Sequence, residues 1–268
     1  MNAIFSTATA KIFKYELSDV IRSNWVIVYA AFFFAVTEAF FQFGRGSGSV
    51  MLSLMNVVLI LVPLVCAIFG TIYLYNAREF TELMLSQPVQ RSSLLAGLYT
   101  GLSVPLAASF ALGVGLPFAL HGVESADQAV TLALMLAIGV LLTFVFIALA
   151  ALVATLFQDK VKGLATSVLG WLFFAVLYDG IVLLLVNAFA AYPLEKPMIG
   201  FTLLNPVDLG RVLLMLQFDI SALMGYTGAV FQTFFGSAWG MVISFSALGI
   251  WLLVPLFFTF RAFERRDF

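Results

Sequence analysis

The sequence predicts an all-α membrane protein with six transmembrane helices. Of its 268 residues, 63% are hydrophobic and 10% are charged, whereas a soluble domain is about half apolar and about a quarter charged. A soluble chain this poor in charge would lack the polar surface needed to cover its core, so lipid is the expected solvent. The apolar residues also fall into six runs of about 20 residues or more, the length needed to cross a bilayer.

The segment before the first run, residues 1–24, is mixed in character. Phe13, Leu17 and Ile21 would share one face of a helix, and Lys14 and Arg22 the opposite face. This spacing predicts an amphipathic helix that lies in the membrane interface before the first span.

The six predicted transmembrane helices follow in order. Their approximate bounds are 25–43, 50–75, 94–120, 129–157, 164–190 and 239–260. Pro63, Pro105 and Pro117 lie inside them, which a membrane helix tolerates where neighbouring groups satisfy the freed carbonyls. Short turns join most of the spans. The longer connections are 76–93, between the second and third spans, and 191–238, between the fifth and sixth.

The positions of lysine and arginine predict the orientation, because cytoplasmic loops are enriched in both. With the N-terminus inside, ten of the thirteen basic residues are cytoplasmic. These ten are Lys11, Lys14, Arg22, Arg78, Arg91, Lys160, Lys162, Arg261, Arg265 and Arg266. Only Arg45, Lys196 and Arg211 then lie outside. Both termini are therefore predicted inside, and residues 191–238 outside.

The 76–93 connection contains a predicted short amphipathic helix that ends before Pro88. Its apolar residues are Phe80, Leu83 and Met84, and its polar residues are Arg78, Glu79, Glu82 and Ser86. Such a helix can insert into a groove on a cytosolic partner. The alternative is a solvated interfacial helix without a partner.

The 191–238 connection contains a second predicted helix. Asn205 is suited to the N-cap, Pro206 to the first helical position and Asp208 to the first turn. Leu209, Val212, Leu213 and Leu216 then recur on one face. We expect a large extramembrane or interfacial segment with at least one amphipathic helix.

Four residues inside the predicted spans are candidates for function. Glu38 and Asp179 are carboxylates in apolar runs, which are costly there and suggest a functional site; polar lining of an outer vestibule or a helix-packing contact is the simpler interpretation. Met51 and Met55 are one helical turn apart, and thioethers suit Cu(I). Methionine is also an ordinary packing residue, and the simpler interpretation again is packing.

Several functions lack their sequence signals. The chain has no GxxxxGK[ST] phosphate-binding loop and no HExxH zinc motif. It has a single cysteine, Cys66, and a single histidine, His121, expected in an exposed loop; these cannot form a thiolate cluster or a paired haem site. The net charge of −1 suggests no nucleic-acid partner. A membrane enzyme or electron-transfer subunit would need more ligands, and a secondary transporter would usually show internal repeats, of which none is evident.

Three segments carry a resemblance to a known family. ELSDVIRSNW (Glu16–Trp25) and REFTELMLSQPVQR (Arg78–Arg91) resemble the interfacial helix and the coupling region of the ABC-2-type permeases. The long segment Asn205–Gly236 resembles, more narrowly, the permease subunits of transporters that mature nitrous-oxide reductase in denitrifying bacteria.

The resemblance implies a permease subunit without enzymatic activity or a cofactor of its own. Two copies would pair in the bacterial inner membrane as a homodimer. Two separate cytosolic ATPase subunits would bind ATP and Mg²⁺, and a periplasmic right-handed β-helix protein would bind the outer face. The complex would assist assembly of the copper–sulfur centres of the reductase, with copper, sulfur or mechanical work alone crossing the membrane.

The resemblance also implies which residues meet the partners. The ATPase contact would comprise Arg78, Glu79, Phe80, Glu82, Leu83, Met84, Gln87, Pro88, Arg91, Lys160 and Lys162. The periplasmic contact would comprise Asn205, Pro206, Asp208, Arg211, Asp219 and Tyr226. An outer vestibule would be lined by Glu38, Met51, Met55 and Asp179.

Overall fold

The protein is helical throughout the part of the chain that the computed structural model describes, which comprises residues 24–44, 46–86, 90–189, 195–218 and 231–265. Within these ranges there is no strand, so the predicted all-α class is confirmed. The predicted interfacial helix lies, apart from Asn24, outside the described residues, and so do Gln87, Pro88, Asp219 and Tyr226.

Six helices are long and apolar enough to cross a membrane, in agreement with the six predicted spans. They are α2 (Asn24–Phe43), α3 (Ser47–Asn76), α5 (Arg91–His121), α6 (Ala126–Leu156), the continuous α7–η1–α8 segment (Lys160–Ala188) and α12 (Ala238–Glu264). The chain is therefore a multi-pass membrane protein. Three shorter helices are α4 (Arg78–Leu85), α9 (Glu195–Leu203) and α10 (Pro206–Gln217).

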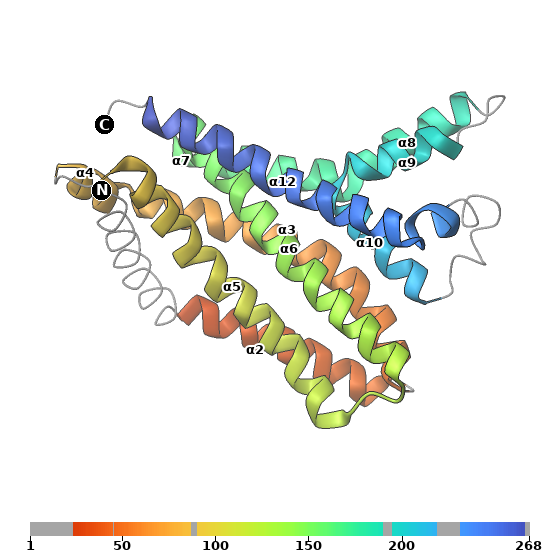
Figure 1. Cartoon of the computed structure of the whole chain (residues 1–268). Helices are drawn as coiled ribbons and strands as arrows, with labels where there is room; N and C mark the ends of the chain where they lie inside the picture. Colours follow the sequence, from red (N-terminus) through yellow and green to blue (C-terminus); the bar gives the residue numbers. More distant parts are fainter. Residues whose placement is uncertain (1–23, 45, 87–89, 190–194, 219–230, 266–268) are drawn as a thin grey trace.

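The helix α6 lies at the centre of the bundle, against α3, α5 and α12 (Figure 1). Its neighbour α5 also packs along α2, where Phe33 and Phe110 meet edge to face with ring centroids 5.2 Å apart. Both rings are fully buried. These contacts belong to the main apolar core. Such packing stabilises the bundle, because in lipid helices associate through close side-chain contacts rather than through the hydrophobic effect.

The α7–η1–α8 segment lies at the edge of the bundle. Only 6% of its most apolar stretch is buried, compared with 56% for that of α6. Its apolar side chains therefore face outward, as expected for a span that contacts lipid. Residues Phe173–Leu177 form a π-helical segment, η1, between α7 (Lys160–Leu172) and α8 (Tyr178–Ala188), whereas the sequence predicted one regular span.

The turn between α2 and α3 is tied to the turn between α5 and α6. Gly46 has a φ of +97°, which favours glycine. The next residue, Ser47, donates its backbone N–H to Glu124 Oε1 at 3.2 Å and its hydroxyl to Gln128 Oε1 at 2.5 Å. These bonds tie the start of α3 to the start of α6.

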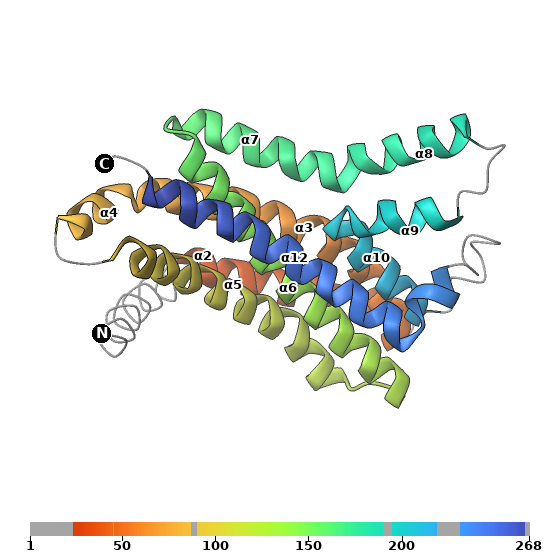
Figure 2. The ribbon, with the colours of Figure 1, turned by 45° about the horizontal axis from the view of Figure 1, so that its top comes forward.

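The segment between α8 and α12 differs from the predicted extramembrane segment. Helices α9 and α10 are bent by 112° relative to each other, and α10 packs against α3, α6 and α12. Gly210 lies against Leu59 and Ile138, deep in the bundle. The apolar face expected to rest on an interface is buried among transmembrane helices instead. In Figure 2, α9 starts beside the end of α8 and α10 returns toward the same end of the molecule.

Candidate functional site

The helix α4 presents two different faces at one end of the bundle (Figure 2). Phe80 and Met84 pack on Leu94 and Leu98 of α5. Glu79, Glu82, Leu83 and Ser86 are exposed, and Leu83 retains 66% of its accessible surface. Of the predicted partner-binding residues on α4, the exposed set is therefore Glu79, Glu82 and Leu83.

A second exposed segment, the turn between α6 and α7, lies at the same end. Asp159 caps α7 by accepting the N–H groups of Val161 and Lys162 at 2.7 and 3.2 Å. Val161 and Lys162 are exposed. Lys160 donates to Asn76 Oδ1 at 2.8 Å, so one of the two predicted lysines of this turn is engaged with the end of α3.

Arg78 joins the two segments. Its guanidinium donates to the carbonyl oxygens of Ala154, Phe157 and Gln158 at 2.9, 2.6 and 2.5 Å. The α4 surface and the α6–α7 turn therefore form one continuous structure, which we call the α4 platform: α4 with residues 157–162.

The second predicted arginine of this region, Arg91, holds a different helix. Its guanidinium donates to Glu264 O at 3.2 Å and to Phe263 O at 3.4 Å, at the end of α12. Both arginines that flank α4 thus lie on the last carbonyls of a transmembrane helix. The sequence prediction placed both on a partner surface and did not anticipate these internal contacts.

A polar cluster lies between α8 and α10 in the other half of the bundle. Arg211 Nη1 contacts Asp179 Oδ2 at 2.6 Å and Asp208 Oδ1 at 2.9 Å. Asn205 is fully buried; its amide nitrogen donates to Phe174 O at 2.8 Å and to Asp208 Oδ2 at 2.9 Å, while its Oδ1 accepts Val207 N–H. Asp179, predicted to line a vestibule, and Asp208 and Arg211, predicted to meet a partner, therefore belong to one internal network.

A cavity of about 280 Å³ borders this cluster. Asp179, Asp208 and Tyr178 line it together with residues of α8 and α9. The Tyr178 hydroxyl donates to Phe201 O at 2.7 Å. The aromatic donor was not predicted from the sequence, because only the fold brings α8 beside α9.

The contacts of Met51, Met55 and Glu38, the remaining candidate functional residues inside the spans, indicate what each of them does. Met51 and Met55 are 0% and 3% exposed and belong to the apolar core, so they line no open vestibule in the described chain; their helical face points at neighbouring helices. Glu38 Oε1 lies 3.4 Å from His121 Nε2. His121 is the last residue of α5, stacked on Phe41, and not in a loop as predicted, because α5 ends one residue later than the predicted span.

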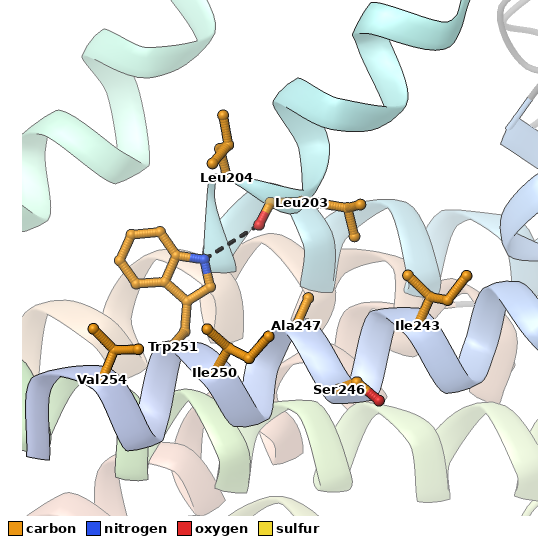
Figure 3. A pocket seen from close by; sticks show the side chains of 8 residues that line it. All are labelled: Leu203, Leu204, Ile243, Ser246, Ala247, Ile250, Trp251 and Val254. Carbon is orange, nitrogen blue, oxygen red and sulfur yellow. Dashed lines mark hydrogen bonds between the residues drawn. The ribbon is translucent and has the colours of Figure 1, made fainter. Parts of the chain in front are cut away.

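Among the described residues, no group of three or more His, Cys, Asp and Glu side chains is arranged to hold a metal ion. A larger cavity of about 520 Å³ lies between the end of α9 and α12 (Figure 3). It is lined by apolar side chains such as Leu204, Ile250 and Val254, and Trp251 Nε1 donates to Leu203 O at 3.2 Å. This lining offers no charged group that could bind an ion.

The fold and the α4 platform define a class: a multi-pass helical membrane subunit with an exposed helix between its second and third spans. The sequence profile of the ABC-2 family transporter proteins matches residues 10–268. The chain therefore belongs to the ABC-2 transporter family. It is similar to the probable ABC transporter permease protein NosY of Pseudomonas aeruginosa, with 24% identity over 78% of this chain and 82% of that protein. It is also similar to the probable ABC transporter permease protein NosY of Stutzerimonas stutzeri, with 23% identity over 99% of both chains.

Proposed function

We propose that this chain is the permease subunit of an ABC transporter that couples ATP hydrolysis in a separate cytosolic subunit to assembly of the copper–sulfur centres of periplasmic nitrous-oxide reductase. The observation that carries the proposal is the similarity to two NosY permeases, one of them over 99% of both chains. In this proposal the chain acts as a homodimer in the bacterial inner membrane. The homodimer would carry copper or a sulfur species across the membrane, or would transmit mechanical work alone.

The exposed face of the α4 platform, which consists of Glu79, Glu82 and Leu83 on α4, is the proposed contact with the ATPase. The sequence contains no phosphate-binding loop of its own, so the nucleotide belongs to a partner and the energy has to enter through a protein contact. Glu79, Glu82 and Leu83 offer two carboxylates beside one exposed apolar side chain. A partner groove with a basic rim and an apolar floor would complement this face.

The proposed periplasmic partner, a right-handed β-helix protein, would bind residues of the 191–238 segment. Asp208, Arg211 and Asn205 contribute to the internal network of α8 and α10, so in this proposal they support that surface from beneath. The contacts with the partner would then come from other residues of the segment.

The docking role is tested by charge reversal in the full chain expressed with its ATPase. Glu79→Lys with Glu82→Lys should abolish co-purification of the ATPase, because two repulsive contacts replace two attractive ones. Glu264→Lys is the control, since it reverses an exposed charge at the same end of the bundle on α12. Unchanged assembly and ATP turnover in the double variant would refute the contact.

The reductase role is tested separately in a denitrifying host that lacks its own copy of the gene. Complementation with this chain and its partner subunits should restore the copper content of the purified reductase. If the ATPase assembles with the chain but the reductase stays without copper, the chain is an ABC-2 exporter for another substrate.

A further inference from the structure

The side chain of Arg78 lies on the end of a transmembrane helix, pointing away from the exposed face of α4. The last carbonyls of a helix have no partner within the helix and carry partial negative charge. Two such carbonyls, those of Ala154 and Phe157, accept hydrogen bonds from the terminal nitrogens of Arg78, and so does the carbonyl of Gln158 in the turn that follows. This contact joins the first residue of α4 to the end of α6.

Tyr75 reinforces the same junction from α3. The Arg78 guanidinium lies over the Tyr75 ring, 4.0 Å from its centroid, and the Tyr75 hydroxyl donates to Phe157 O at 2.9 Å. The backbone of Gly163 in α7 passes directly against the same ring, leaving no room for a Cβ atom. The start of α7 is therefore held by the same side chain that supports Arg78.

We propose that Arg78 is the positioning residue that transmits movement of α4 to α6 and α7. This inference rests on the proposed function, in which an ATPase acts on α4. The guanidinium bonds the end of α6 and Gln158 in the following turn, and it lies on the Tyr75 ring that packs against Gly163 of α7. A displacement of α4 therefore pulls on the end of α6 and, through Tyr75, on the start of α7. The α7–η1–α8 segment has little packing to resist such a pull, since only 6% of its apolar stretch is buried.

The π-helical segment η1 gives this movement a place to bend. A π-helical turn interrupts the regular i→i+4 bonding of the α-helix around it with i→i+5 bonds, and such turns occur frequently at functional sites. η1 lies between α7, which the Arg78 junction holds, and α8, which the Arg211–Asp179 pair holds. Movement at the start of α7 would therefore reach the far end of the span as a change of angle at Phe173–Leu177.

Arginine is required at this position because of the shape of its side chain. A guanidinium offers five N–H donors in a rigid plane, whereas a lysine ammonium is a point charge with three donors on a flexible stem. Arg78→Lys would keep the charge but could not hold all three carbonyls at once. Arg78→Gln would remove both the charge and the fork.

The experiment uses the complete complex with its ATPase, reconstituted in lipid nanodiscs. A single spin label on Leu183→Cys, which is exposed on α8, reports the distance between the two protomers with and without trapped nucleotide. In the otherwise unaltered complex the distance should change with nucleotide. Arg78→Gln should bind the ATPase and hydrolyse ATP but lose the distance change, and Arg78→Lys should show a smaller change. Arg261→Gln, which removes an exposed cation on α12, should behave as the unaltered complex.

Two outcomes would overturn the inference. Arg78→Gln could retain the full distance change, or both Arg78 variants could release the ATPase while Arg261→Gln keeps it, which would make Arg78 a docking residue. Failure of the proposed function looks different, because the unaltered chain would then not bind the ATPase at all. Arg78→Lys preserves the charge at the helix end, so it keeps the test valid where Arg78→Gln does not fold.

Discussion

Arg211 pairs with two carboxylates in the polar cluster between α8 and α10. Arg211 contacts Asp208 on its own helix and Asp179 on α8, and the Arg211 side chain retains 24% of its accessible surface. Removing one partner from such a pair costs more than the pair itself contributes, because a partly buried charge is left without compensation. The cluster is thus a structural link between α8 and α10 that depends chiefly on the arginine.

Substitutions in this cluster should therefore destabilise the protein to different extents, with the loss of Arg211 costing the most. Arg211→Gln leaves both carboxylates without their cation and should destabilise the protein by roughly 2 kcal/mol. Asp179→Asn leaves the Arg211–Asp208 pair intact and should cost less. Thermal unfolding of both variants in the same detergent measures the order, with Arg261→Gln as the exposed control. A larger loss for Asp179→Asn would contradict this account.

The burial of Met51 and Met55 on α3 indicates that both side chains serve to pack the core. Both thioethers are enclosed by the apolar core, where leucine has a similar volume. Replacing Met51 and Met55 together by leucine should cost less than about 1.5 kcal/mol at each site and leave copper-centre assembly intact. The copper content of the reductase in a complemented host measures this. Loss of copper with normal folding of the permease would assign the thioethers a role as ligands.

At the scale of the helices, the sequence predicted what depends on composition and local pattern. The six spans follow from apolar length, and Asn205 caps α10 and Pro206 opens it, as their sequence indicates. The packing of α10 against α3, α6 and α12 could not be predicted. An amphipathic helix has the same sequence pattern whether its apolar face rests on a membrane interface or packs against other helices. The internal contacts of Arg78 and Arg91 were also missed, since they join residues 76–80 and 172–173 positions apart.

The approach of α7 to α3 gives a prediction with a control on the same helix. Gly163→Ala would place a Cβ atom against the Tyr75 hydroxyl, whereas nothing lies within 4 Å of a Cβ at Gly170. Gly163→Ala should destabilise the protein by about 1–3 kcal/mol through overpacking. Gly170→Ala should be neutral or stabilising by up to about 1 kcal/mol, because alanine favours a helix. Equal unfolding midpoints for the two variants would show that α7 does not depend on this contact.

For the whole molecule, burial separates a packed core from peripheral spans. The apolar stretches of α5 and α6 are 61% and 56% buried, against 6% for α7–η1–α8 and 17% for α12. Arg211 in the polar cluster attaches the peripheral α7–η1–α8 segment to α10 through Asp179. Arg78 bonds the end of α6 and the turn that leads into α7. In the proposed function, this arrangement would let one span move while the core stays intact.

The number of crossings depends on whether the bent pair α9–α10 crosses the membrane: six if the pair enters and leaves on one side, seven if it crosses fully. The end of α12 bears on this choice, because Arg91, at the start of α5, donates to Glu264 O at 3.2 Å. Glu264 therefore lies at the same end of the bundle as α4, which an even number of crossings explains. The return of α10 toward the end where α9 starts (Figure 2) favours six, and so do the ten basic residues predicted inside.

Cysteine labelling tests the predicted orientation. A membrane-impermeant maleimide added to intact spheroplasts should label Ala126→Cys, at the exposed start of α6. It should label Glu264→Cys only after the membrane is permeabilised, because both termini are predicted inside. The native Cys66 is fully buried and should stay unlabelled in both conditions, which makes it an internal control. Labelling of Glu264→Cys in intact spheroplasts would show that the end of α12 faces outward and would contradict the predicted orientation.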